Sequence, residues 1–288
     1  MPCHLSIFQA MVLGIVQGLT EFAPVSSSGH LILVPWLFHW CIVTPANETL
    51  NKTFDVALHM GTFVGAVVYF WQDIVRYLRA WGRSIARRAI RSTDERLAWA
   101  LVIGTIPGAI AGAAGEDFID KKLGQPWLIA IMLAVFGVIL YVVDRRARQS
   151  RDIRDVRLGD AIFIGIAQAV ALQPGVSRSG VTITAARGVG IKREDAARFS
   201  FLLSLPIIGG AGLYKGFKFL TGSEHIPPGF GGAFAAGVVA SAVSGFLVIW
   251  FLLAYLRRRD FAPFVIYRIL AAAFVLAIIA AGVRGSTI

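Results

Sequence analysis

The residues best suited to chemistry lie near the amino terminus, in the run Gly-Leu-Thr-Glu-Phe-Ala-Pro-Val-Ser-Ser-Ser-Gly-His at positions 18–30. Glu21 is the only acidic residue well inside an apolar segment, where a charge is costly and indicates function. Gln17 lies one helical turn earlier, so both side chains are expected on one face. Their oxygens suit a hard divalent cation, Mg²⁺ or Ca²⁺. The open alternative is a Glu21 that only hydrogen-bonds a neighbouring loop.

The serine run that follows is placed to bind an anion. Ser26, Ser27 and Ser28 precede Gly29 at a predicted helix start, where free backbone N–H groups and the helix dipole favour negative charge. A serine hydroxyl is also a nucleophile, and His30 can act as general acid or base, or attack phosphorus itself. Two plainer roles stay open, a serine that only caps the helix and a structural histidine.

A second loop, Pro-Gly-Val-Ser-Arg-Ser-Gly at 174–180, offers the opposite charge. Arg178 stands between Ser177 and Ser179 and ahead of Gly180, again at a predicted helix start. An arginine at membrane depth needs a negative partner, and its planar fork matches phosphate oxygens. A structural ion pair with Glu21 is the alternative. Both can hold in turn, with Glu21 as the resting partner and phosphate as the bound one.

The two loops belong to an internal duplication. Residues 14–29 and 165–180 align at a constant offset of 151 with seven of sixteen positions identical, including Gly14/Gly165 and Gln17/Gln168. Self-similarity at a fixed offset indicates a repeat rather than chance agreement of two turns. The reactive positions have diverged, since Glu21 aligns with Leu172 and Ser27 aligns with Arg178. Different reactive groups in similar loops predict one site built from both halves.

The composition indicates a polytopic membrane protein. The chain is 56% hydrophobic and 16% charged, against about 25% charge in a usual soluble domain, and its mean hydropathy is +0.68. Six stretches approach the length of a membrane span, at about 54–72, 97–115, 127–143, 195–217, 231–255 and 263–283. Two segment pairs, 5–21 with 29–40 and 159–172 with 181–190, are short and interrupted by the turn-rich loops. Such breaks are typical of re-entrant helices that line a cavity.

We therefore expect an all-α integral membrane protein with six transmembrane helices and two re-entrant helix pairs in an inverted-topology repeat. It forms one domain, 1–288, with repeats at about 1–150 and 158–288. The net charge of +11 is concentrated in loops between apolar runs, which argues against nucleic acid as a partner. The positive-inside rule places four arginine-rich loops in the cytoplasm and both termini outside. The two re-entrant helix pairs are then expected to enter the membrane from opposite faces and to meet near its middle.

Other polar residues are less informative at this stage. Several are expected either to line the cavity or to hydrogen-bond helix carbonyls, namely His59, Thr62, Thr182, Thr184, Ser200 and Ser204. Arg198 and Arg268 fall near predicted cytoplasmic helix ends, where snorkelling accounts for them. Cys3 and Cys41 fall at the outer end of the first pair, where a disulfide is geometrically possible, although free thiols are the more common outcome.

The motifs at 18–33 and 174–180, with Arg-Phe-Ser-Phe-Leu-Leu-Ser-Leu-Pro at 198–206, resemble the undecaprenyl-diphosphate phosphatase (bacitracin-resistance) family of bacterial inner-membrane proteins. The resemblance runs from about Leu5 to the last span. It implies removal of the terminal phosphate of undecaprenyl diphosphate, a divalent metal, and a site open to the periplasm. It also implies that Ser27 and His30 are the catalytic pair and that Arg178 binds phosphate. Gln17 stands where many members carry glutamate, which lowers the charge available to a metal.

These observations predict phosphoryl transfer to Ser27. His30, oriented by Glu21, is expected to take the serine proton, while Arg178, backbone N–H groups and a cation neutralise the phosphate oxygens. Ser26, Ser28, Gly29, Ser177, Ser179 and Gly180 are expected to contact the polyprenyl diphosphate. A rival hypothesis is an inverted-repeat transporter or flippase of a phosphorylated lipid, which needs neither nucleophile nor base. A homodimer is also compatible with the sequence.

Overall fold

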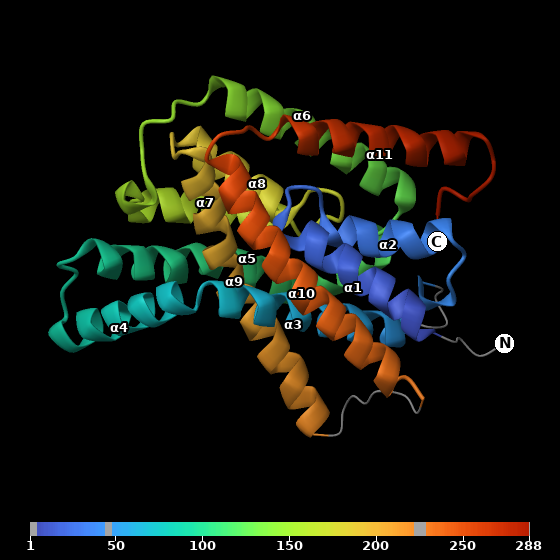
Figure 1. The fold of residues 1–288 in the computed structure, drawn as a ribbon, viewed down its shortest axis with the longest axis horizontal. Helices are drawn as coiled ribbons and strands as arrows, with labels where there is room; N and C mark the ends of the chain where they lie inside the picture. The colour runs from blue at the N-terminus through green and yellow to red at the C-terminus, as the bar shows by residue number, and fades with distance from the viewer. Residues whose placement is uncertain (1–4, 44–47, 222–228, 288) are drawn as a thin grey trace.

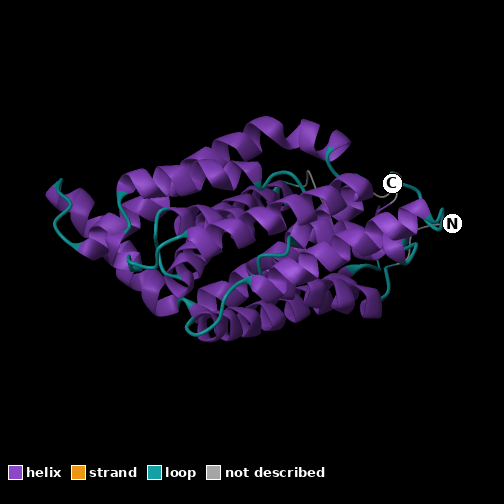
Figure 2. Ribbon diagram, turned by 90° about the horizontal axis from the view of Figure 1, so that it is seen from above, coloured by secondary structure: helices purple, strands orange, loops and turns teal. Residues whose placement is uncertain are grey.

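The computed structural model describes residues 5–43, 48–221 and 229–287, and these are folded almost entirely as helices joined by short loops (Figures 1 and 2). In chain order the elements are α1 (Ile7–Phe22), α2 (Ser27–Leu37), the 3₁₀ turn η1 (Cys41–Val43), α3 (Glu48–Tyr69), α4 (Trp71–Arg87), α5 (Thr93–Lys122), α6 (Pro126–Arg146), the 3₁₀ turn η3 (Ile153–Asp155), α7 (Leu158–Val170), α8 (Arg178–Gly188), α9 (Arg193–Leu220), α10 (Gly231–Leu256) and α11 (Ala262–Ala280). Within these residues the only β pairing is an isolated bridge between Arg151 and Ile191. A Cys3–Cys41 pairing involves Cys3, which lies outside the described residues.

Five helices of the described residues are long and apolar enough to cross a membrane, and a sixth candidate exists if α3 and α4 count as one bent span. The five lie within α5, α6, α9, α10 and α11. The axes of α3 and α4 differ by 81° across the break at Phe70. The chain is thus an all-helical protein with five or six candidate spans, in agreement with the composition.

One predicted loop is a helix. The arginine-rich segment after the first span folds as α4, and not as an irregular connection. Its face toward the protein buries Tyr77, Ala80 and Ser84, spaced three and four residues apart, while Arg79 and Arg83 are exposed on the other face. That 3.6-residue period specifies an amphipathic helix, which the arginine count alone had obscured.

Each interrupted segment folds as two short helices, α1 with α2 and α7 with α8. α2 and α8 each begin after a serine in the left-handed backbone region, Ser26 with φ 77° and Ser177 with φ 74°. Each serine hydroxyl accepts the N–H of the third residue on, Gly29 or Gly180. A non-glycine residue rarely adopts such a φ, at a cost of about 1–3 kcal/mol. The same uncommon conformation at equivalent positions supports the duplication.

Paired glycines set how closely the short helices approach the long ones. A Cβ on Gly14 of α1 would lie 2.3 Å from the carbonyl oxygen of Gly237 in α10. A Cβ on Gly165 of α7 would lie at the same distance from the carbonyl oxygen of Gly104 in α5. α1 therefore packs on α10 as α7 packs on α5, with backbones in contact at both crossings.

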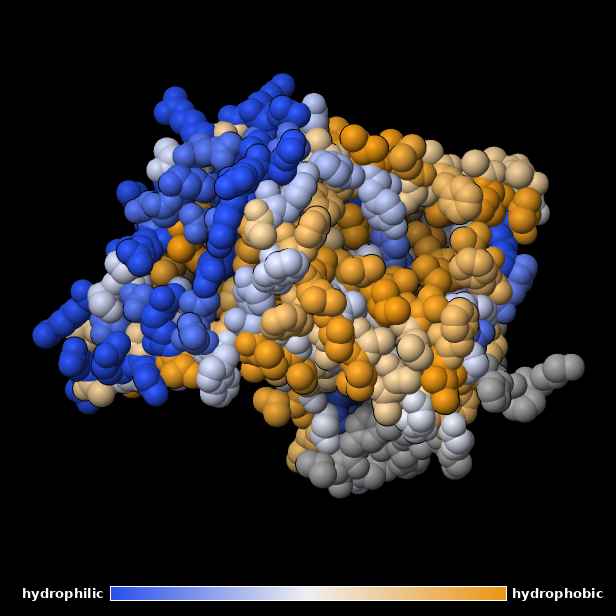
Figure 3. All heavy atoms as spheres, in the orientation of Figure 1, coloured by the Kyte–Doolittle hydropathy of each residue, from blue (hydrophilic) through white to orange (hydrophobic). Residues whose placement is uncertain are grey.

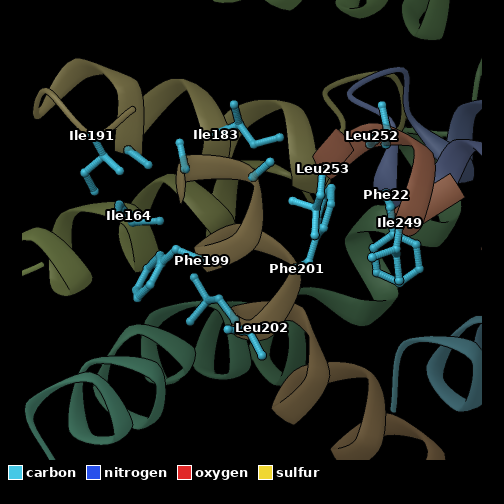
Figure 4. Packing of buried hydrophobic residues seen from close by; sticks show 14 of the residues in the cluster. Phe22, Ile164, Ile183, Ile191, Phe199, Phe201, Leu202, Ile249, Leu252 and Leu253 are labelled. Carbon is cyan, nitrogen blue, oxygen red and sulfur yellow. The ribbon is translucent and has the colours of Figure 1, made fainter. Parts of the chain in front are cut away.

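A buried apolar cluster joins the ends of the short helices to α9 and α10 (Figure 4). Phe22 at the end of α1 packs edge to face on Phe201 of α9, with ring centroids 5.2 Å apart. Leu252 and Leu253 of α10 are almost fully buried in the same cluster. Because Phe22 directly follows Glu21, this packing fixes where the first loop begins.

Hydrophilic side chains gather on one side of the molecule, at the left of Figure 3, where α4 lies in Figure 1. Asp144 of α6 is buried between two arginines, with 2.8 Å to Arg187 Nε and 2.9 Å to Arg193 Nη2. Arg198 pairs with Asp73 of α4, so it makes a specific ion pair and does not merely snorkel.

A further ion pair lies outside the candidate spans, at the first turn of α7. Arg151 pairs with Asp160, whose carboxylate also accepts the backbone N–H of Arg157 at 2.8 Å. Burial alone would raise the pKa of Asp160, but these hydrogen bonds and charges outweigh it and hold the pKa below its usual value.

Candidate active site

The two predicted loops meet and bond to each other in the interior. The hydroxyl of Ser26 accepts the backbone N–H of Gly175 at 3.0 Å. In return, the hydroxyl of Ser179 donates to the backbone carbonyl of Ala23 at 2.9 Å. These reciprocal bonds join residues about 150 positions apart, and the loops lie side by side at the centre of Figure 1. The structure thus brings together the two loops that the sequence predicted to share one site.

A buried arginine from a third element ties the two loops together. Arg268 of α11 is fully buried and donates to Pro24 O of the first loop at 3.0 Å. It donates to two carbonyls of the second loop, Gly175 O at 2.8 Å and Val176 O at 3.1 Å. Further donations reach two carbonyls of α6, at 2.8 and 3.3 Å. Arg268 therefore does not snorkel, and the sequence-based interpretation of this residue was wrong.

Glu21 is the centre of the polar network. One carboxylate oxygen, Oε1, bonds Arg178 Nη2 of the second loop. The other, Oε2, accepts the hydroxyl of Ser27 at 2.6 Å and the amide N–H of Gln17 at 2.9 Å. Glu21 is only 5% exposed, so these donors, and not water, satisfy the hydrogen-bonding capacity of its carboxylate. Gln17 and Glu21 share a face as predicted, and the alternative Arg178–Glu21 ion pair is present.

His30 is bonded away from Ser27. Its Nδ1 lies 2.7 Å from the backbone carbonyl of Ser26 and must donate there, so its neutral Nε2 accepts from Tyr267, 2.7 Å away. The rings of His30 and Tyr267 are stacked, with centroids 5.6 Å apart. Glu21 thus holds the Ser27 hydroxyl itself, and the expected orientation of His30 by Glu21 is not found.

A cavity of about 220 Å³ opens beside this network. Its polar walls include Ser27, Ser28, Ser177 and Arg178, and its apolar wall comes from α5, α7 and α9. The structure thus brings four of the predicted site residues to one cavity. Four others are engaged in holding the loops, with hydroxyls bonded across the loops or backbone N–H groups capped by serine: Ser26, Ser179, Gly29 and Gly180.

His59 of α3 lines the cavity and also bonds a helix carbonyl, the two roles that the sequence analysis left open for it. Its Nδ1 donates to Asp55 O at 2.7 Å, and its Nε2 lies 3.4 Å from Glu21 Oε2 on the cavity wall. The signal was a histidine one turn after an aspartate in an otherwise apolar helix, Phe-Asp-Val-Ala-Leu-His at 54–59. Nothing in that spacing says that α3 faces the first loop. The role of Arg268 was also missed, because its acceptors are backbone carbonyls, which carry no sequence signal.

The predicted cation ligands partly fit a metal. Gln17 uses its amide N–H on Glu21, which leaves Gln17 Oε1 buried with no donor in the described residues. A buried amide oxygen beside a carboxylate is the kind of ligand that hard cations bind. The described residues contain no cluster of three or more His, Cys, Asp or Glu side chains arranged for a metal. A cation here would therefore rely on these two residues and on oxygens of the substrate.

These features define a polytopic, all-helical membrane protein with a buried serine–carboxylate–arginine site. The profile of the family described as bacitracin resistance protein BacA matches residues 10–274. An undecaprenyl-diphosphatase of Desulforudis audaxviator is 48% identical over 94% of this chain and 97% of its own length. Proteins of the same name from Pelotomaculum thermopropionicum and Moorella thermoacetica are each 46% identical, over 96% and 95% of the chain and 98% of their own lengths. The chain belongs to the BacA family.

Proposed function

We propose that this protein is an undecaprenyl-diphosphatase that releases inorganic phosphate from undecaprenyl diphosphate and returns undecaprenyl phosphate to cell-wall synthesis. The names of its BacA-family relatives support this substrate. The observation that carries the proposal is the serine hydroxyl of Ser27, held 2.6 Å from Glu21 Oε2 while Arg178 bonds the other carboxylate oxygen at the cavity wall. The proposed nucleophile Ser27, base Glu21 and phosphate ligand Arg178 therefore lie in direct contact.

The first chemical step is attack of Ser27 Oγ on the terminal phosphorus. Glu21 accepts the serine proton, the new P–O bond forms, and the bridging P–O bond breaks with its electrons leaving on undecaprenyl phosphate. In the second step, the oxygen of a water molecule bonds to the phosphorus of the phosphoserine and the bond from Ser27 Oγ to phosphorus breaks. Glu21 returns its proton to Ser27 Oγ, and inorganic phosphate leaves with both hydrogens of the water. Glu21 serves as base in the first step and supplies a proton in the second.

Arg178 is proposed to exchange partners during the cycle. In the structure it bonds Glu21. When a diphosphate enters the cavity, the guanidinium transfers to the phosphate oxygens, whose geometry matches its fork. The starts of α2 and α8 add dipoles and N–H groups that favour the same anion.

A divalent cation, Mg²⁺ or Ca²⁺, is proposed to bind Gln17 Oε1 and Glu21 together with phosphate oxygens. Magnesium is commonly held in this way, by one or two protein oxygens and substrate phosphates. When bound, it would supply charge neutralisation on the diphosphate. We further propose that His30 positions the start of α2 through its bond to the Ser26 carbonyl.

The arrangement in the membrane is also part of the proposal. α1–α2 and α7–α8 form re-entrant pairs of an inverted repeat, supported by their matching caps and glycine crossings. The arginine-rich side faces the cytoplasm of a bacterial inner membrane, and the site opens to the periplasm with both termini on that side. A homodimer is compatible with this arrangement, and cross-linking in membranes is its direct test.

The test is release of inorganic phosphate from a prenyl diphosphate by the purified protein in detergent, with Mg²⁺, with Ca²⁺ and with chelator. Glu21→Gln should lower kcat by about 10²–10⁴, the usual contribution of a general base, and Arg178→Ala by about 10²–10³. Ser27→Ala retaining full turnover would refute the covalent step. No release by the wild type under any metal condition would favour the transporter hypothesis.

A further inference from the structure

Gln168 of α7 is buried, and its side chain has no hydrogen-bond partner in the part of the chain that the structure describes. The residue is 4% exposed, and neither its amide nitrogen nor its amide oxygen bonds any described residue. A buried amide is nearly always satisfied, because losing its hydrogen bonds to water costs free energy. An amide kept in this state therefore indicates a ligand that is bound during function.

The duplication shows why the partner is missing. Gln168 is equivalent to Gln17 at the offset of 151, and Gln17 donates to Glu21 one turn later at 2.9 Å. The residue one turn after Gln168 is Leu172, which has no acceptor in its side chain. The second half has thus kept the amide and lost the carboxylate, so the amide is available to another acceptor.

The unpartnered amide faces the cavity of the active site. Gln168 lines it with Ser27 and Arg178, and its neighbours on that wall are apolar, with Leu172 and Ile207 among them. Gly108 of α5 leaves room for the side chain. A Cβ there would lie 3.0 Å from Gln168 Nε2 and 2.9 Å from the Cδ1 of Ile207.

We propose that Gln168 Nε2 donates a hydrogen bond to the phosphate that stays on the prenyl chain, an inference that rests on the proposed function. In an in-line reaction the leaving oxygen departs on the side opposite Ser27 Oγ. The lipid-linked phosphate must then lie away from Ser27, toward a wall that also accepts the start of an apolar chain. Gln168 supplies the only amide among the cavity-lining residues of the described chain, set in that apolar wall.

The experiment compares wild type with Gln168→Leu, using farnesyl diphosphate as substrate and farnesyl monophosphate and inorganic phosphate as inhibitors. The KM for the diphosphate and the Ki for the monophosphate should each rise roughly 10- to 100-fold, the effect of losing one hydrogen bond to a charged group. The Ki for inorganic phosphate should change less than about twofold, because that product lies beside Arg178. The Tm should stay the same or rise, because leucine removes an unsatisfied buried amide.

Gly108→Ala is the second variant, since it displaces the amide without deleting it and should also raise the KM. Thr105→Val, which removes only a hydroxyl bonded to Leu101 O on the same helix, is the control and should leave the KM unchanged. An unchanged KM in both Gln168→Leu and Gly108→Ala would show that the amide binds water only and would overturn the proposal. A weakened Ki for inorganic phosphate alone would place Gln168 on the transferred phosphate and would also overturn it. Absence of turnover in the wild type would instead refute the proposed function.

Discussion

Replacing Arg268 with methionine removes the tie between the two loops while keeping a long, unbranched side chain. Three of its five acceptors, the carbonyls of Pro24, Gly175 and Val176, lie in loops and have no other donor among the described hydrogen bonds. A buried acceptor left unsatisfied costs about 1–3 kcal/mol, so the three together give roughly 3–9 kcal/mol. Methionine also removes the free-energy cost of burying the guanidinium charge, which offsets part of this loss. The carbonyl acceptors, however, stay buried without a donor. We expect a loss of about 3 kcal/mol or more.

The assay is thermal unfolding in detergent together with phosphate release. The Tm of Arg268→Met should fall by at least about 5 °C, and kcat/KM should fall about 100-fold, because a misplacement near 1 Å between reacting groups has that effect. Arg268→Lys keeps the charge with fewer donors and should be intermediate. Arg258→Met, an exposed arginine beyond α10, is the matched control. If Arg268→Met kept the wild-type Tm and a kcat/KM within threefold, the tie would have no structural or positioning role.

Three further predictions concern parts of the fold outside the cavity. Asp144→Asn should destabilise the protein by about 3–5 kcal/mol, measured by thermal unfolding, because it leaves two arginines without their shared carboxylate; an unchanged Tm would show that the pairs contribute nothing. Gly165→Val should sharply reduce the folded yield, scored by size-exclusion chromatography, because its side chain would enter the carbonyl of Gly104, whereas Gly82→Ala, with open space around it, should be harmless. Asp160→Asn should lower the Tm at neutral pH. A depressed folded pKa gives stability that is fully present above the ordinary value of 3.8 and is lost as the pH falls through the folded pKa, so the two Tm curves should converge in acid; curves that stay parallel to pH 3 would contradict the pKa assignment.

Much of the local structure was predictable. The repeat at an offset of 151 identified both loops, and the turn residues within it located the breaks between α1 and α2 and between α7 and α8. Apolar run length identified the long helices, because the requirement to satisfy backbone hydrogen bonds in lipid leaves few other structures. Glu21, Ser27 and Arg178 stood out because charged and nucleophilic residues are rare in such runs.

The partners of those residues were not predictable from spacing. The sequence placed His30 three positions after Ser27 and suggested a direct contact, but the helix start directs its imidazole to Ser26 O and Tyr267. His59 reaches Glu21 only because α3 packs beside α1. α4 showed a related error, since counting arginines concealed the period of the apolar residues between them.

The sequence by itself determined the helical membrane class, the duplication and the identity of the candidate nucleophile and phosphate ligand, because these follow from residue types and their separation along the chain. It assigned the base to His30, and only the fold brought Glu21 to the Ser27 hydroxyl. Tertiary structure alone decided that Arg268 joins the two loops and that the side chain of Gln168 has no hydrogen-bond partner among the described residues. Both depend on which atoms from distant helices fill the space around a side chain. Backbone carbonyls that accept from Arg268 exist at every position, so only the fold can select among them.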